Sequence, residues 1–222
     1  QSKTLVKSKT PKKIFVSRSG SASKVGGLIA GEGYEDAIDE VVAMVEALVE
    51  AGKFPIELNL AGFSRGADTM LRVSNVLNAM YKRDVVRVNI FALDPVPGTG
   101  RQASKKARVI PDNVQEYEAV LMRDERGALL RSQDKRHLAV QRPDVTRVTH
   151  HLYHGVHGDG NYFRANPAGS EDDAKKRYDV MQDTPRLVWD DLWKFAERHG
   201  VRFRNNEFNY LEKQKVSKKS VY

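Results

Sequence analysis

Cysteine is absent from the 222-residue chain. Its absence excludes a disulfide framework, so a hydrophobic core has to stabilise the fold, and the chain is long enough to bury one. Long apolar runs are missing too, since none approaches the roughly 18 residues of a membrane-spanning helix. No secretory leader pattern is found near the first residue, which predicts a cytoplasmic protein in the producing cell unless a specialised secretion system delivers it.

Acidic residues are fewer than basic residues. The chain has 37 Lys and Arg residues against 29 Asp and Glu residues, a net charge of +8. Much of the excess lies in residues 3–13, 101–108 and 213–219. Such runs are commonly solvated tails or loops, and the alternative is attraction to anionic lipid head groups. No helix-turn-helix, zinc-finger or aromatic RNA-binding pattern accompanies them, so an anionic membrane surface is a better expected partner than nucleic acid.

Apolar patterning predicts strands that alternate with helices. Strands are expected at 14–16, 56–61, 86–93, 114–123 and 145–152, helices at 34–51, 67–82 and 184–200, and a basic loop at 98–111. No internal repeat interrupts this order. The alternation is typical of an α/β fold with a mainly parallel sheet flanked by helices.

A Gly-x-Ser-x-Gly segment, Gly62-Phe-Ser64-Arg65-Gly66, joins the strand expected at 56–61 to the following helix. In this context the pattern is typical of a nucleophile elbow, a sharp turn that exposes a serine hydroxyl to a base. Without the context it is an ordinary glycine-rich turn. Ser64 is therefore the predicted nucleophile. The Arg65 amide is the first expected oxyanion donor, and the loop that begins at Ser17 is the expected source of a second.

An acid and a base are expected after the later strands. Asp94 follows the strand at 86–93, which gives the order Ser, Asp, His of α/β-hydrolases if a histidine near residues 150–157 completes the set. Asp94 would hold the imidazole in the required tautomer. Its other interpretation is an Asx-type turn before a proline. Asp124 and Asp159 are the competing acids.

Four histidines lie close together: His150, His151, His154 and His157. The spacing of three within this cluster would suit metal ligands on a helix, but the segment reads as a strand that runs into a glycine-rich loop, so we expect neither a metal ion nor an organic cofactor. His157 lies beyond the strand in Gly-Val-His-Gly-Asp-Gly and is the favoured base. His154 is the alternative.

Four segments carry a resemblance to a known family: 62–67, 94–96, 118–126 and 155–159. They are similar to the Gly-Phe-Ser-Arg-Gly-Ala elbow, the Asp-x-Val, the Ala-x-x-x-Asp-Glu-Arg and the Gly-Val-His-x-Asp-x-Gly-Gly motifs of one group of α/β-hydrolases. That group comprises the type VI secretion phospholipase effectors (Tle-type lipases) and their uncharacterised relatives. The segments occur in family order. The resemblance implies Ser64 as nucleophile, Asp94 as acid and His157 as base.

The resemblance also sets the expected domains and activity. A basic lead-in at 1–12, an α/β-hydrolase-like domain at 13–205 and a basic tail at 206–222 are expected. The expected activity is cofactor-independent ester hydrolysis by a phospholipase or lipase, against the alternatives of a soluble carboxylesterase or a noncatalytic interaction domain. Two features depart from the family: the strand that ends in Asp-Gly-Thr is not found, which points to an upstream region of a longer protein, and Asn161 replaces a glycine.

Overall fold

The computed structural model describes residues 12–18, 34–97, 108–124, 133, 138–160 and 183–201, the first segment by its backbone alone. Five strands of these residues form one sheet in the order β1-β2-β3-β5-β7, and every neighbouring pair is parallel. The strands are β1 (Lys12–Arg18), β2 (Ile56–Phe63), β3 (Val86–Leu93), β5 (Val114–Met122) and β7 (Arg147–Tyr153). The predicted parallel sheet flanked by helices is confirmed.

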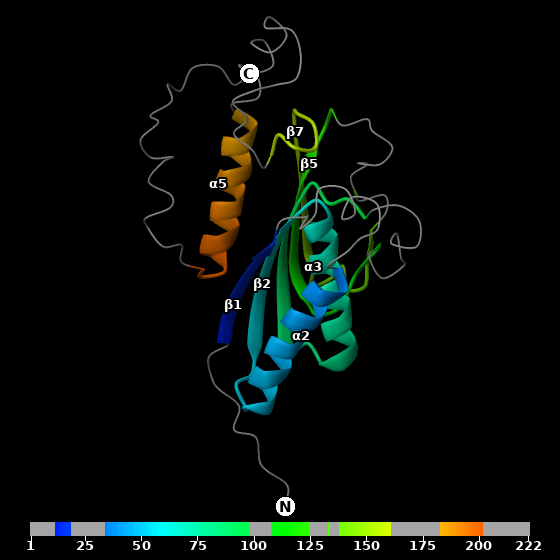
Figure 1. Cartoon of the computed structure of the whole chain (residues 1–222), viewed down its shortest axis with the longest axis vertical. Coiled ribbons are helices and arrows are strands. Elements are labelled where there is room, and N and C mark those ends of the chain that lie inside the picture. The colour runs from blue at the N-terminus through cyan, green and yellow to red at the C-terminus, as the bar shows by residue number, and fades with distance from the viewer. Residues whose placement is uncertain are drawn as a thin grey trace, which may run out of the picture.

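Helices cover both faces of the sheet (Figure 1). Two of them, α2 (Tyr34–Glu50) and α3 (Arg65–Met80), contact one another on one face. A right-handed crossover between neighbouring parallel strands puts its connection on the same face each time, which explains why these two helices share a side. Another helix, α5 (Asp183–Arg198), comes after β7 in the chain and covers the opposite face. Within the described residues, no helix combines the length and the apolarity that crossing a bilayer demands.

A second, two-stranded parallel sheet corrects one prediction. It pairs β4 (Val109–Ile110) with β6 (Ala139–Val140), so the loop expected over 98–111 contains a strand at 109–110. The side-chain amide of Asn75 on α3 donates to the carbonyl of Val109 at 2.9 Å, which ties this sheet to the helix. A strand of two residues has no periodicity for sequence reasoning to detect.

The sheet face toward α2 and α3 is apolar. Alternate strand residues such as Leu58, Ile90 and Ala119 are fully buried there against α3 residues such as Met70 and Leu77. Burying an aliphatic side chain of this size contributes about 1.5–3 kcal/mol. This face therefore supplies the main core, and it holds β2 and α3 rigidly on either side of the turn between them.

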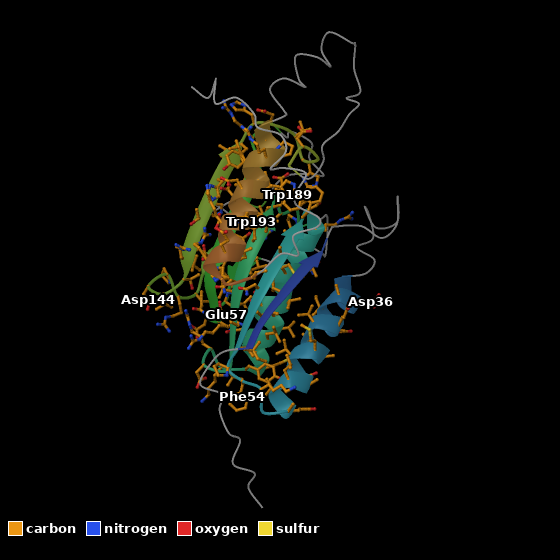
Figure 2. The ribbon with its side chains drawn as sticks, turned by 90° about the vertical axis from the view of Figure 1, so that its left-hand side faces the viewer. Asp36, Phe54, Glu57, Asp144, Trp189 and Trp193 are labelled. Atoms are coloured by element: carbon orange, nitrogen blue, oxygen red, sulfur yellow. The ribbon has the colours of Figure 1, made fainter. Side chains whose placement is uncertain are left out.

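The face toward α5 is divided into two zones. Near the carboxyl ends of the strands it is apolar, and Phe91, Leu93 and Met122 pack with Val188 and Phe195 of α5. Lower on the strands it carries charged and polar side chains, among them Glu57 near the lower end of α5 (Figure 2). Hydrophobic contact thus fixes the helix at the end of the sheet where the predicted catalytic residues lie.

Candidate active site

The turn from β2 to α3 has the geometry of a strained elbow. Ser64 has φ 56° and ψ −124°, outside the regions that residues with a Cβ normally adopt. A Cβ on Gly62 would lie 2.5 Å from the carbonyl carbon of Gly66, so the strand and the first helical turn meet too closely for a side chain. The serine side chain is consequently held at the end of the sheet, at the first turn of α3.

Backbone hydrogen bonds join this elbow to the end of β3. The Ser64 amide donates to the Leu93 carbonyl at 2.9 Å, and the Val96 amide donates to the Ser64 carbonyl at 3.2 Å. Asp94 lies between them with φ 41°, a second positive φ in a residue that is not glycine. Its Oδ1 accepts the Met122 amide at 2.9 Å. The carboxylate is therefore fixed from two neighbouring strands.

One imidazole connects the serine to this carboxylate. His157 Nε2 lies 2.7 Å from Ser64 Oγ, and His157 Nδ1 lies 2.6 Å from Asp94 Oδ2. The Asp94 side chain is fully buried and that of His157 is 12% exposed. The Phe63 ring stacks on the imidazole, with ring centres 4.9 Å apart and planes 25° from parallel. The structure thus brings together the three residues that the sequence predicts as nucleophile, acid and base.

Two carboxylates hold the loop that carries His157. Asp124 Oδ2 accepts the Gly155 amide at 2.8 Å, and the Asp124 amide donates to the Gly155 carbonyl at 3.0 Å. Asp159 Oδ2 accepts a hydrogen bond from the Val156 amide at 2.6 Å, and the Asp159 amide donates to the Val156 carbonyl at 2.8 Å. Gly155 has φ +130°, where a Cβ would also lie 3.0 Å from the Asp159 carboxylate. These contacts set the direction in which the loop leaves β7.

The competing assignments are placed elsewhere. His154 has a 59% exposed side chain that lies 3.0 Å from Arg123 Nη1 and 3.5 Å from Asp124 Oδ2, without a hydrogen bond to Ser64. Asp124 and Asp159 bind backbone amides rather than the His157 ring. The hydrogen bond from the Gly155 amide is the main interaction that holds the pKa of Asp124 below its ordinary value. Neither acid is positioned as the partner of the imidazole.

The expected oxyanion donors lie beside the elbow. Arg65 is the first residue of α3, and the first amides of a helix have no intrahelical acceptor, so they remain free to bind an anion. Ser17 belongs to β1, where it pairs with Ala61, and the next pair joins Arg18 to Gly62. Strand β1 therefore ends next to the elbow. The remainder of the predicted loop, 19–33, lies outside the described residues.

A charged network that sequence reasoning missed fastens α5 to the sheet. Glu116 accepts hydrogen bonds from Arg198 at 3.0 Å and from His199 at 2.8 Å, and Glu118 pairs with both Arg198 and His151. Burial alone would raise the pKa of Glu116, but hydrogen bonds from His199 and Arg147, with the Arg198 charge, lower it to about 2. For Glu118 burial prevails over these partners and raises its pKa. The alternation of Glu116 and Glu118 on one strand face was the only available signal.

One group in the described segments has metal-ligating side chains within reach of one another. Donor atoms of Glu118, His151 and Asp191 all lie within 4.8 Å. Arg198 already pairs with Glu118, and the Tyr153 hydroxyl donates to Asp191 at 2.6 Å. Because a guanidinium supplies positive charge where a cation would bind, an ion-pair network explains this group better. The clustered histidines do not converge, since His151 faces these carboxylates and His157 faces Ser64.

Comparisons with known proteins add little. No protein-family model and no curated protein matches the sequence. Among solved structures, an uncharacterized protein from Pseudomonas aeruginosa aligns with 19% identity and a TM-score of 0.34 over 56% of this chain. The alignment covers 22% of that protein's chain, so this chain spans about a fifth of its length. A likeness of this extent carries no argument about activity.

Proposed function

We propose that this protein is a serine-dependent ester hydrolase in which Ser64 is the nucleophile, His157 the general base and Asp94 the orienting acid. The observation that carries the proposal is the single imidazole bonded through Nε2 to Ser64 Oγ at 2.7 Å and through Nδ1 to Asp94 Oδ2 at 2.6 Å. A serine hydroxyl becomes nucleophilic when an adjacent base is itself oriented by a third group, which is the relationship among these residues.

The first half of the reaction forms an acyl-enzyme. Ser64 Oγ attacks the carbonyl carbon of the ester as His157 Nε2 takes the hydroxyl proton. The Asp94 carboxylate accepts the Nδ1–H hydrogen bond and stabilises the imidazolium that forms. The carbonyl oxygen becomes an oxyanion, which the Arg65 amide at the start of α3 stabilises. When the tetrahedral intermediate collapses, the bond to the alcohol breaks and Nε2 returns the proton to the departing oxygen.

The second half releases the acid. Water gives a proton to Nε2 while its oxygen attacks the acyl carbon, and Ser64 Oγ then departs with that proton. The strained Ser64 backbone keeps Oγ in one place through both halves, because the hydrogen bonds to Leu93 and from Val96 fix the turn on each side. The chain's own residues therefore provide every proton transfer that ester hydrolysis requires.

The expected substrate is a membrane lipid, most specifically a phospholipid. This part of the proposal rests on the resemblance of the elbow and the Gly-Val-His-x-Asp segment to the secretion phospholipases. A soluble carboxylesterase would use the same residues on smaller esters. A noncatalytic interaction domain is the remaining alternative, and the proton-transfer contact between His157 and Ser64 speaks against it, since binding a partner does not require that contact.

Labelling by a fluorophosphonate probe tests the proposal, because only an activated serine reacts. We expect the wild-type protein to be labelled and to hydrolyse a p-nitrophenyl ester, and Ser64→Ala to lose labelling and at least roughly 10³-fold in rate. Ser74→Ala is the matched control: Ser74 lies on the same helix and donates to the Leu71 carbonyl at 2.7 Å, away from the site. Wild-type turnover by Ser64→Ala would refute the assignment, and an unlabelled wild-type protein would favour the noncatalytic alternative.

A further inference from the structure

Arg65 has a buried guanidinium with an unsatisfied nitrogen next to the proposed nucleophile. Only 7% of the residue is exposed, and its Nη1 is enclosed without a hydrogen-bond partner. No hydrogen bond or ion pair of its side chain with another described residue is found. Ser64 beside it is 8% exposed, so the two residues are shielded from bulk water to the same degree.

An uncompensated guanidinium is expensive to bury. Removing a guanidinium ion from water is unfavourable unless an opposite charge is supplied. Its position adds to the cost, because the N-terminal end of a helix is itself electropositive. An anion bound beside Arg65 would balance both positive charges.

Neither of two described carboxylates close to the elbow pairs with Arg65, although Asp68 Oδ1 is buried without a hydrogen bond. Asp68 lies on the same turn of α3, but its Oδ2 pairs with Arg72 Nε at 2.8 Å. Burial raises the pKa of Asp68 to about 6, which leaves it a weaker source of negative charge than an ordinary aspartate. Asp94 is bound to His157 and to the Met122 amide. Among the described residues, no carboxylate therefore pairs with the Arg65 guanidinium.

Helix geometry predicts the direction of this side chain. Every Cα–Cβ bond of an α-helix tilts toward the N-terminus, so a long side chain on the first turn leans past the helix end. For α3 that end is Ser64. We therefore expect the guanidinium and the electropositive end of the helix to act on the same region, and a planar guanidinium matches the paired oxygens of a phosphate or a carboxylate.

We propose that Arg65 binds an anionic group, a phosphate or a carboxylate, that the ester substrate carries close to its scissile carbonyl. The inference rests on the proposed hydrolase function and deepens it, because it selects esters with a negative charge near the reacting bond over neutral esters of equal chain length. The backbone amide of Arg65 serves the oxyanion, and its side chain serves the substrate's own charge.

Phosphate binding tests the site without any turnover. Titration of inorganic phosphate into Ser64→Ala, followed by calorimetry at constant ionic strength, should give saturable binding in the millimolar range. Adding Arg65→Met should weaken it about tenfold or more, the effect of losing a hydrogen bond to a charged group. Arg65→Lys should weaken it less. Arg87→Met removes an exposed arginine at the other end of the sheet and should change nothing.

Two results would overturn the phosphate site. The first is no saturable binding to Ser64→Ala. The second is binding that Arg65→Met and Arg87→Met weaken equally, which would indicate an adventitious ion only. If Arg65→Met does not fold, Arg65→Lys in the Ser64→Ala background is compared with Ser64→Ala itself. A phosphate affinity that Arg65→Lys leaves unchanged would exclude the forked contact.

Kinetics separate a substrate phosphate from a free phosphate ion. Two esters of the same acyl chain are compared, one with a neutral alcohol and one whose alcohol bears a phosphate. Arg65→Met should lower kcat/KM for the charged ester at least about tenfold more than for the neutral one. An unchanged ratio in an active enzyme refutes the inference and leaves the hydrolase standing. Phosphate binding through Arg65 without hydrolysis of either ester refutes the hydrolase and leaves the anion site standing.

Discussion

Asp124 and Gly155 exchange two hydrogen bonds across 31 residues of chain: the Gly155 amide donates to the Asp124 carboxylate at 2.8 Å, and the Asp124 amide donates to the Gly155 carbonyl at 3.0 Å. Gly155 lies two residues before His157. Asp124, which the sequence offers as a competing acid, is therefore a positioning residue that acts on the imidazole through the backbone of the loop. A small displacement of the loop would lengthen the 2.7 Å contact to Ser64 on which the proposed reaction depends.

Replacing Asp124 should accordingly affect turnover more than binding. We expect Asp124→Ala to lower kcat about 10–100-fold with little change in KM, since a misplaced base weakens the transition state and leaves the substrate contacts intact. Asp124→Asn keeps an oxygen that accepts the Gly155 amide and should recover most of the rate. If the Asn variant were as slow as the Ala variant, the carboxylate would be acting by its charge and not by this hydrogen bond.

The two histidines of the loop should differ sharply. His157→Ala is expected to reduce ester hydrolysis by at least roughly 10³-fold, because it removes the base from Ser64. His154→Ala should cost little, since its ring is 59% exposed and contacts Arg123 and Asp124. Steady-state kinetics on a soluble ester measure both variants. The reverse ranking would show that the loop rearranges in solution to present His154.

Acid should weaken the docking of α5 through Glu116. The pKa of this carboxyl in the folded protein is about 2, below its ordinary 4.5, because its partners outweigh the burial. Its contribution to stability is therefore complete above pH of about 4.5 and is lost as the pH falls toward about 2. In urea denaturation, the unfolding free energy of Glu116→Gln should fall less steeply over this interval than that of the wild type.

Glu118→Gln is a control for which the expected change in the acid dependence of stability has the opposite sign. Burial raises the pKa of Glu118, so this ionised carboxyl opposes folding and protonation relieves it. In Glu118→Gln the unfolding free energy should therefore fall more steeply with decreasing pH than in the wild type. Equal slopes for the two variants would mean that the contacts of Glu116 with His199 and Arg198 are not maintained in solution.

Binding to anionic vesicles should depend on the basic run 101–108. Of this run the structure describes Arg108, which is exposed. Charge reversal at Lys105 and Lys106 should weaken co-sedimentation with anionic vesicles and spare hydrolysis of a small soluble ester, and rising salt should weaken binding steeply, since screening acts within about 8–10 Å. Reversal at the exposed Lys82 and Arg87 makes the same change in net charge elsewhere. Equal losses from both pairs would leave only a nonspecific charge effect.

Much of the fold could be predicted because its strands are short apolar runs that end in polar or glycine-rich turns. The run at 56–61 and the turn after it located β2, the elbow and α3, and the chain order located Asp94 and His157. The helix begins at Arg65, two residues before the predicted start, because the elbow has no intervening loop. These features are local in sequence, and local patterns determine them.

The contacts that hold the site together could not be predicted in the same way. The pairing of Asp124 with Gly155 and the stack of Phe63 on His157 join residues far apart in sequence, and neither residue type signals its partner. Glu116 and Glu118 occupy strand positions that normally face water, but α5 covers them and brings Arg198 and His199 as partners. Tertiary packing decides such contacts after the elements have formed.

The order of the strands has a consequence for the birth of the protein on the ribosome. The five strands lie side by side in the order in which they occur along the chain. A nascent chain therefore carries Ser64 and Asp94 long before His157 emerges from the ribosome. If Ser64 and His157 act as proposed, a shorter translation product has no base for the serine and should not hydrolyse esters. The proposed activity would require that β7 has joined the sheet and that its loop has docked at the ends of β2 and β3.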